Sequence, residues 1–255
     1  MLKLQTPLEP ETPPHTEQAD PRLAGLTIVL PCHNEQANVV EAVRQARDAA
    51  RSVSLRHEII VVDDGSSDAT AEIAERLVRT SGDVRLVVHG SNRGYGAAVR
   101  AGVSAARMPW ILLTDGDLQF DLADLRRFLP HTRDHDLLIG YREQRNDPVQ
   151  RRINAAGWNW LVRRVFRLRV RDVDCAFKLL RRDLLDGFSL QSDGAMIDTE
   201  LLVKSLRSGA RMRQIGVRHR PRAAEEQSGA HPRVFARALR ELAALRRTFG
   251  STAAR

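Results

Sequence analysis

The stretch Trp110-Ile111-Leu112-Leu113-Thr114-Asp115-Gly116-Asp117-Leu118-Gln119 decides the fold and introduces the chemistry. Its first four residues form a short apolar run bounded by turn residues, which is typical of an interior strand in a parallel sheet. Two carboxylates and an amide follow at the strand's carboxyl end, where open α/β sheets bind their ligands. Because these groups are hard oxygen ligands, the stretch predicts a divalent-cation site. In isolation an Asp-x-Asp is more often a polar turn, so the surrounding pattern has to decide.

That pattern alternates short apolar runs with amphipathic stretches of about 10–15 residues, which is typical of βαβ units and a parallel sheet. We therefore predict an α/β fold with a mostly parallel central sheet flanked by helices. The predicted strands are 26–30, 57–62, 84–88, 110–113, 136–139 and 211–217, with an extended segment at 170–180. The predicted helices are 35–51, 68–80, 97–107, 121–129, 151–167, 197–208 and 233–248, and 218–232 is predicted to be a mobile loop.

Length and composition favour one domain over residues 25–250 of the 255-residue chain. Residues 1–24 hold prolines and scattered acids without an apolar run, so we predict a disordered leader and no signal peptide. No window approaches the roughly 18 apolar residues that span a bilayer. Two isolated cysteines, Cys32 and Cys175, favour reduced thiols and a cytoplasmic location over a disulfide framework.

Charge is divided unevenly along the chain. Residues 1–141 contain 15 Lys and Arg against 20 Asp and Glu, whereas residues 142–255 contain 25 against 12. A basic half beside an acidic, metal-binding half predicts an anionic partner, which is a phosphate, a nucleic acid or a membrane surface.

Polar residues also follow the first two predicted strands, at 31–35 and 63–68. Their carboxylates face the same crevice and are suited to a base edge and a ribose. The pair Asp63-Asp64 also fits a helix-capping turn or a receiver domain, but receiver domains are about half this length and need no second Asp-x-Asp. Gly94-Tyr95-Gly96 provides a turn for phosphate approach or simply a tight turn. Neither a Walker motif nor G-x-G-x-x-G is present, which disfavours nucleotide hydrolysis and dinucleotide binding.

Four ordered motifs carry a specific resemblance: Leu30-Pro31-Cys32-His33-Asn34-Glu35, Val61-Val62-Asp63-Asp64-Gly65-Ser66-Ser67-Asp68-Ala69-Thr70, Asn92-Arg93-Gly94-Tyr95-Gly96 and Asp115-Gly116-Asp117-Leu118-Gln119. Together they resemble family 2 glycosyltransferases of GT-A fold, in the branch similar to dolichol-phosphate-mannose synthase and other polyprenyl-phosphate glycosyltransferases. The resemblance implies that Mg²⁺ or Mn²⁺ is held by Asp115, Asp117 and Gln119, with Asp117 also catalytic. It implies nucleotide binding by Pro31, Asn34, Glu35, Asp63, Asp64, Arg93, Gly94, Asp115 and Gly116.

The later segments Asp172-Val173-Asp174-Cys175-Ala176-Phe177-Lys178 and His219-Arg220-Pro221-Arg222 also resemble this branch. The resemblance implies inverting, metal-dependent transfer from GDP-mannose or a UDP-sugar, bound by residues 25–120, to a polyprenyl phosphate, bound by residues 121–250. A phosphate monoester is mostly dianionic at neutral pH and needs positive charge more than a protein base. The predicted acceptor-binding residues are Arg142, Arg152, Lys178, Arg220 and Arg222.

Several alternatives remain open. Asp198 or Glu200 is placed to act as a catalytic base for a hydroxyl acceptor, such as a soluble glycan, or to orient neighbouring arginines. Arginines with Trp158, Trp160 and Phe166 are suited to peripheral contact with an anionic membrane's inner face, although the aromatics also fit ordinary helix packing. A nucleic-acid-binding protein and a nucleotidyltransferase are disfavoured, because neither an aromatic-basic RNA signature nor a glycine-rich phosphate loop after Leu30 is found. We expect no nucleic-acid partner.

Overall fold

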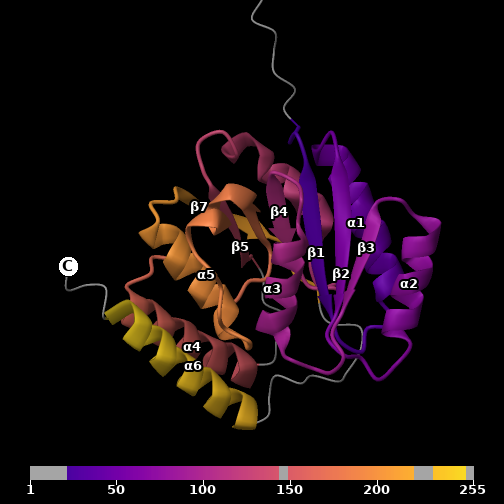
Figure 1. Ribbon diagram of the computed structural model, residues 1–255. Helices are drawn as coiled ribbons and strands as arrows, with labels where there is room; N and C mark the ends of the chain where they lie inside the picture. Colours follow the sequence, from indigo (N-terminus) through magenta and orange to yellow (C-terminus); the bar gives the residue numbers. More distant parts are fainter. Residues whose placement is uncertain (1–21, 144–148, 221–231, 251–255) are drawn as a thin grey trace, which may run out of the picture.

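The computed structural model describes residues 22–143, 149–220 and 232–250 (Figure 1). Nearly all of the predicted leader and most of the predicted loop at 218–232 therefore lie outside the described residues. No helix in the described ranges is long and apolar enough to cross a membrane.

The described chain forms a seven-stranded sheet in the order β3-β2-β1-β4-β6-β5-β7. Six strands run parallel, and β6 runs antiparallel to both of its neighbours. The expected mostly parallel sheet is confirmed. The strands are β1 (Leu26–Cys32), β2 (His57–Asp63), β3 (Val84–Val88), β4 (Trp110–Leu113), β5 (Leu137–Arg142), β6 (Lys178–Arg181) and β7 (Met212–Val217).

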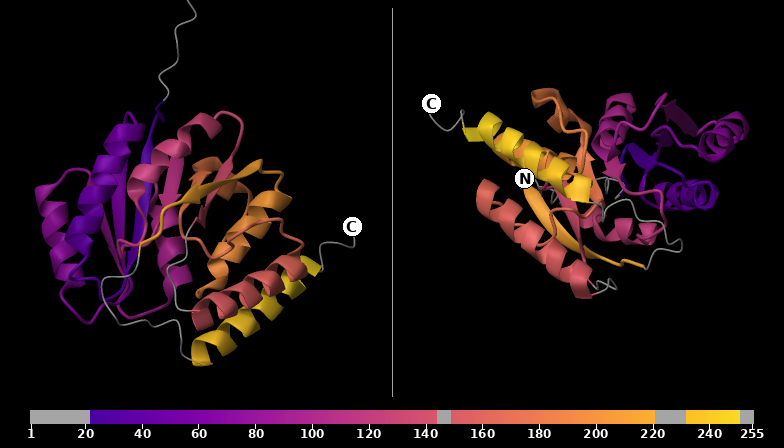
Figure 2. Two further views of the ribbon diagram at one scale, coloured as in Figure 1. Left: turned by 180° about the vertical axis from the view of Figure 1, so that it is seen from behind. Right: turned by 90° about the horizontal axis from the view of Figure 1, so that it is seen from below.

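Helices cover both faces of this sheet (Figures 1 and 2). Ile28 and Leu30 of β1 pack into a core with α1, whereas Val29 packs into a second core with α3 and α5. A central strand that buries both faces is therefore apolar throughout, as the sequence pattern indicates. The helices are α1 (Val39–Val53), α2 (Thr70–Thr80), α3 (Tyr95–Ala105), α4 (Val149–Phe166), α5 (Met196–Arg207) and α6 (Pro232–Gly250).

Helices α4 and α6 lie side by side at the edge of the second core (Figure 2). Phe166 at the end of α4 meets Phe249 of α6 edge to face, with ring centroids 6.1 Å apart. This contact attaches the carboxyl-terminal helix to the body of the fold.

Three predicted elements differ in the structure. The prediction of an extended segment over 170–180 was wrong, because the strand in this region is confined to Lys178–Arg181. The backbone before it is bound by α4 side chains: Asn159 Oδ1 accepts from Val173 N at 2.8 Å, and Arg163 Nη1 donates to Val170 O. The helix at 121–129 is instead two 3-10 turns, η1 (Leu122–Arg127) and η2 (Leu129–His131). Finally, α1 begins at Val39 rather than at residue 35.

Candidate functional site

The candidate site lies at the carboxyl edge of the sheet, where β1, β2 and β4 end together. Cys32 at the end of β1 is in register with Asp63 of β2, and β4 pairs with the other side of β1. A cavity of about 440 Å³ opens at this edge. It is lined by Pro31, Cys32, His33, Glu35, Asp64, Asn92, Gly94, Tyr95, Ala98, Asp115, Gly116, Asp117, Gly194, Ala195, Ala238 and Glu241.

The turn after β4 places Asp115 and Asp117 against β1. A Cβ atom on Gly116 would lie 2.7 Å from Cys32 Sγ, so glycine is required for this close approach. Leu118 adopts a positive φ of 63°, and Gln119 N donates to Asp117 Oδ1 at 3.1 Å. The backbone thus folds around the carboxylate pair, as expected for a built site rather than a solvated turn.

Asp115 sits among other negative charges. Burial and the carboxylates of Asp117 and Asp198 raise its pKa to about 7, against opposing contributions from Tyr95 and Lys178. Asp115 Oδ1 is buried without a hydrogen-bond partner among the described residues. Concentrated, incompletely compensated negative charge of this kind is relieved by a cation.

The donor set fits a divalent cation shared with a substrate. Within the described ranges, no three His, Cys, Asp or Glu side chains gather into a complete ligand cluster. Mg²⁺ is commonly held by one or two carboxylates together with substrate phosphates and water, so two aspartates suffice for such a site. Gln119 is nearby, and its Nε2 donates to Arg220 O at 3.2 Å.

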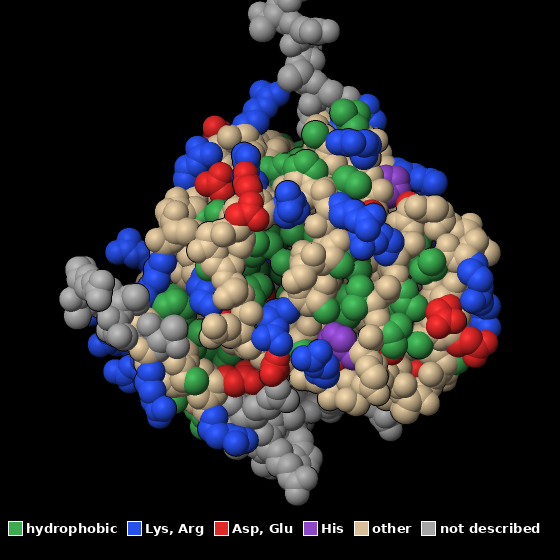
Figure 3. All heavy atoms as spheres, viewed as in Figure 1, with side chains coloured by type: hydrophobic (Ala, Val, Ile, Leu, Met, Phe, Trp, Pro, Cys, Tyr) green, Lys and Arg blue, Asp and Glu red, His purple; other side chains and the backbone are tan. Residues whose placement is uncertain are grey.

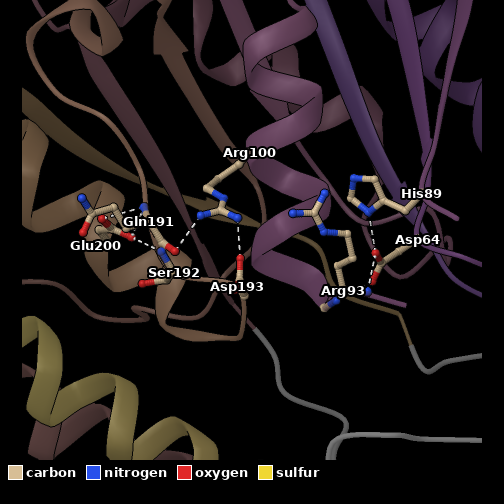
Figure 4. Close-up of polar contacts among 9 residues, drawn as sticks. Asp64, His89, Arg93, Arg100, Gln191, Ser192, Asp193 and Glu200 are labelled. Carbon is tan, nitrogen blue, oxygen red and sulfur yellow. Dashed lines mark hydrogen bonds and ion pairs between the residues drawn. The ribbon is translucent and has the colours of Figure 1, made fainter. Parts of the chain in front are cut away.

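Asp64 organises the glycine turn before α3 (Figure 4). Its Oδ1 accepts from Arg93 N at 3.0 Å and its Oδ2 from Gly94 N at 2.8 Å, while His89 Nδ1 lies 2.7 Å from Oδ1. Gly94 has φ of 104°, which only glycine adopts readily. The acid after β2 therefore holds the turn that leads into the cavity.

The loops after β1 and β2 are tied to each other. Asn34, with φ of 57°, accepts from Ser67 N at 2.9 Å, and its own N–H donates to Ser66 Oγ at the same distance. Buried Glu35 accepts from Asn38 Nδ2 at 2.6 Å, and buried Asp63 accepts from Ser66 N at 3.2 Å. Of the predicted nucleotide-binding residues, the cavity is lined by Pro31, Glu35, Asp64, Gly94, Asp115 and Gly116, whereas Asn34, Asp63 and Arg93 are not among its lining residues.

Two of the predicted acceptor-binding residues are committed to buried ion pairs. Arg142 meets Asp172 through two hydrogen bonds of 2.7 and 2.9 Å. Lys178 is fully buried, donates to Cys175 O and lies 2.6 Å from Asp198 Oδ1. Lys178 therefore supplies positive charge to the carboxylate cluster, while Arg142 is occupied by Asp172.

The remaining acceptor-side predictions differ in position. Arg220 is largely exposed, pairs with Asp121 at 3.2 Å, and donates its backbone N–H to Gln119 O at 2.7 Å. It lies beside the predicted metal turn, on a segment that β7 brings back across the sheet edge. Arg152 lies on a stretch of α4 whose side chains are not described, and Arg222 lies outside the described residues.

The two candidate bases occupy different environments. Asp198 is bound by Lys178 and faces the carboxylate cluster; burial raises its pKa despite that lysine. Glu200, two residues later, accepts from Gln191 N and Ser192 N at 2.9 and 2.7 Å (Figure 4). Burial opposes its ionisation, but these bonds and Lys204 hold the pKa of Glu200 below its ordinary value. Asp198 thus acts on the charge of Asp115 without lining the cavity, whereas Glu200 of α5 binds the backbone of a neighbouring loop.

Sequence reasoning missed several lining residues. Tyr95 stands inside a motif that was interpreted through its glycines alone, yet it lines the cavity beside Asp115. Gly194, Ala195, Ala238 and Glu241 carry no sequence signal, because a helical or loop pattern does not reveal which wall an element will cover. The position of Tyr95 between two turn glycines was the one sequence feature that could have indicated a lining residue.

Comparisons with known proteins agree with this geometry. The family model described as "Glycosyl transferase family 2" matches residues 27–188. A dodecaprenyl-phosphate galacturonate synthase from Rhizobium johnstonii is 34% identical over 172 residues, covering 66% of this chain and 51% of that protein. An undecaprenyl-phosphate 4-deoxy-4-formamido-L-arabinose transferase from Pseudomonas paraeruginosa is 29% identical over 164 residues, covering 64% and 48%. The chain thus spans about half the length of these curated relatives.

Solved structures share the fold at lower identity. Mannosyl-3-phosphoglycerate synthase from Rubrobacter xylanophilus superposes with a TM-score of 0.66 at 18% identity, covering 89% of this chain and 75% of that one. Glucosyl-3-phosphoglycerate synthase from Mycobacterium tuberculosis, solved with Mn²⁺ and UDP, gives 0.60 at 20% identity, covering 88% and 76%. These likenesses confirm the GT-A fold.

Proposed function

We propose that this chain, which belongs to glycosyl transferase family 2, transfers a sugar from a nucleotide sugar to a polyprenyl phosphate. The observation that carries the proposal is the carboxylate pair of partly exposed Asp115 and buried Asp117, which line a cavity at the carboxyl edge of β1, β2 and β4. The relatives named as acting on dodecaprenyl phosphate and undecaprenyl phosphate support the acceptor class. The donor occupies the half formed by residues 25–120, and the acceptor occupies the half formed by residues 121–250.

On the donor side, Glu35, Asp63 and Asp64, which follow or end β1 and β2, bind the nucleoside, and the turn at Gly94 leaves room for the diphosphate. Asp115 and Asp117, with Gln119, hold a divalent cation. When bound, that cation supplies the positive charge that stabilises the leaving nucleoside diphosphate. Tyr95 lines the same cavity as Asp115, and the close approach of Gly116 to Cys32 places the carboxylate pair against β1.

On the acceptor side, the lipid phosphate is itself the nucleophile and attacks the anomeric carbon from the face opposite the leaving group, with inversion. The chain's task there is to lower the electrostatic cost of bringing two anions together. Lys178 contributes charge from within the fold, and Arg220, whose backbone N–H binds Gln119 O, provides an exposed guanidinium beside the predicted metal turn.

We infer that the chain works at the membrane surface, since a polyprenyl chain is held there. Trp160 on α4 is 61% exposed and lines a shallow groove with Arg163, Arg164 and Arg169. Trp158 is half-buried, and Phe166 packs against α6, so the membrane contact that we propose centres on Trp160 and its arginines. Sedimentation with vesicles containing anionic lipid, compared with neutral vesicles, measures this contact.

A hydroxyl acceptor is the second candidate function. It is favoured by Asp198, a buried carboxylate of raised pKa next to the Asp115 cluster, which is suited to accept a proton. Transfer to undecaprenyl phosphate and to undecaprenol, with a panel of UDP- and GDP-sugars, separates the two. Transfer to the phosphate alone supports the proposal; equal transfer to both lipids contradicts it and assigns the base to Asp198.

A further inference from the structure

The loop formed by residues 189–195 packs directly on the amino-terminal end of α3. Gly96 N and Ala97 N donate to Asp193 O at 2.9 and 3.3 Å. A Cβ atom on Gly96 would lie 2.5 Å from Ser192 O and 2.7 Å from Gly194 O. The second glycine of the Gly-Tyr-Gly motif is therefore explained by this loop's close approach. The loop starts just after the residues matched by the family model, which end at 188.

Arg100 fastens the loop from the α3 side (Figure 4). Its Nη1 donates to Gln191 O at 2.6 Å and its Nη2 donates to Asp193 Oδ1. The side chain is 26% exposed, so the contacts are partly shielded from water. A planar guanidinium that binds a backbone oxygen and a carboxylate together restrains both position and orientation.

Glu200 fastens the same loop from the α5 side. Its fully buried carboxylate accepts from Gln191 N and Ser192 N, and Lys204 completes its ion pair. The carbonyl of Gln191 is thus bound by Arg100 while its amide is bound by Glu200. Two charged side chains from different helices converge on one short backbone segment.

The fastened loop ends at the cavity. Gly194 and Ala195 line the cavity and neighbour the α6 residues Ala238 and Glu241. Figure 4 places Arg100 and the loop on one side of α3, with Asp64 and His89 on the other. Because Asp64 belongs to the proposed nucleoside side, the loop lies at the opposite end, where a donor's sugar would extend.

We propose that Arg100 and Glu200 are positioning residues that hold the loop 189–195 as the sugar-side wall of the cavity, so that this loop selects the sugar. The inference rests on the proposed function, since it assumes a nucleotide-sugar donor. It gives Glu200 an anchoring role in place of that of a base, and it gives Arg100 a role that none of the four motifs indicates.

The test compares binding of UDP-glucose, UDP-galacturonate and GDP-mannose with binding of free UDP and GDP by calorimetry. In Arg100→Gln, the affinity gained from the sugar should fall about tenfold or more for the preferred donor, because the loop loses the charge-assisted contacts that hold it in place. Affinity for the free nucleoside diphosphate should change less than about twofold. Arg100→Lys, which keeps the charge but not the planar fork, should give an intermediate loss.

Amide hydrogen exchange supplies a readout that requires no ligand. The amides of Gly96, Gln191 and Ser192 should exchange at least about tenfold faster in Arg100→Gln and Glu200→Gln than in the unmodified chain. Arg76→Gln is the matched control, since Arg76 makes an exposed helix ion pair with Glu72 far from the loop. It should alter neither measurement.

The outcomes separate this inference from the proposed function. If no nucleotide sugar binds to the unmodified chain, the proposed function fails and the sugar-wall assignment fails with it, while hydrogen exchange still decides the anchoring role. The loop is not the sugar-side wall if donors bind but Arg100→Gln lowers the affinities for the nucleotide sugar and for the free nucleoside diphosphate equally. The same holds if both affinities stay unchanged. Unchanged amide exchange overturns the anchoring role itself.

Discussion

The proposed donor side and the proposed acceptor side of this molecule differ in how their charges are compensated. On the proposed donor side, partly exposed Asp115 and buried Asp117 lie next to further carboxylates, and desolvation together with the charges of Asp117 and Asp198 raises the pKa of Asp115 to about 7. On the acceptor side, Arg142 and Lys178 already have carboxylate partners within the chain. The first region holds incompletely compensated negative charge, which fits the cation that we propose, whereas much of the second is internally neutralised.

This difference limits what net charge reveals. The carboxyl half has a large excess of arginine, yet Figure 3 shows Lys and Arg side chains spread over the visible face with Asp and Glu among them, not gathered in one patch. Arg218 adds a further example, since it binds Asp121 and Asp124 at 3.0 and 2.9 Å. A basic composition therefore indicates an anionic partner only after the internal pairs have been removed from the count.

The largest expected effect comes from the donor side. Asp117→Ala should lower turnover by about 10³-fold or more, because it removes charge that organises the leaving diphosphate. Its thermal unfolding midpoint should stay close to that of the unmodified chain, since carboxylate repulsion is relieved. Steady-state kinetics and calorimetric melting measure the two effects. Near-normal turnover would remove Asp117 from the site.

Lys178→Ala should destabilise the fold by about 3–5 kcal/mol, because Asp198 is left buried without its partner. Denaturant unfolding measures this free energy. Lys178→Met combined with Asp198→Leu should recover much of the loss, since neither charge remains. A stable Lys178→Ala variant with a raised acceptor KM would instead show that Lys178 binds substrate and is not internally committed.

Glu58 lies at the amino end of β2, and we expect it to contribute to stability and not to catalysis. It accepts from Thr27 Oγ1 and Arg107 N, both at 2.7 Å, and it pairs with Arg85. Burial opposes ionisation of Glu58, but these partners lower its pKa in the folded state. The ionised carboxylate therefore stabilises the fold fully above its unfolded-state pKa near 4.5. This stabilisation is lost as the pH falls through the lower folded-state pKa.

Glu58→Gln should therefore lower the free energy of unfolding by about 1–3 kcal/mol at pH 7 and by progressively less below pH 4.5. Turnover at pH 7 should be unchanged, because the residue lies at the strand end opposite to the cavity. Unfolding curves across pH, with turnover alongside, make the comparison. A pH-independent difference would disprove the role of ionised Glu58.

Arg220→Ala carries the smallest expected effect, about a fivefold to tenfold rise in the acceptor KM, equivalent to about 1.0–1.4 kcal/mol. The free energy of unfolding should hardly change, since its pair with Asp121 is exposed. Arg213→Ala, which removes an exposed arginine from β7, is the control for net charge. Equal shifts in both variants would mean that overall charge, not Arg220, attracts the acceptor.

The parts that could be predicted from the sequence are those determined by local pattern. Apolar runs ending in carboxylates indicated β1, β2 and β4, and the shared carboxyl edge follows from parallel pairing. The segment before Lys178 was mispredicted because Asn159 and Arg163 of α4 bind its backbone, a contact that strand propensity does not contain. Arg100 and the loop were missed for the same reason: their contacts join residues about 90 positions apart.

We propose above all that the carboxyl edge of β1, β2 and β4 binds a nucleoside diphosphate together with a divalent cation. Calorimetric titration with UDP and GDP tests this most directly. We predict that one of the two nucleotides binds when Mn²⁺ or Mg²⁺ is present and that chelation weakens this binding by at least about tenfold. Asp115→Asn should have the same effect without loss of fold. Nucleotide binding of equal strength without cation, and in Asp115→Asn, would contradict it.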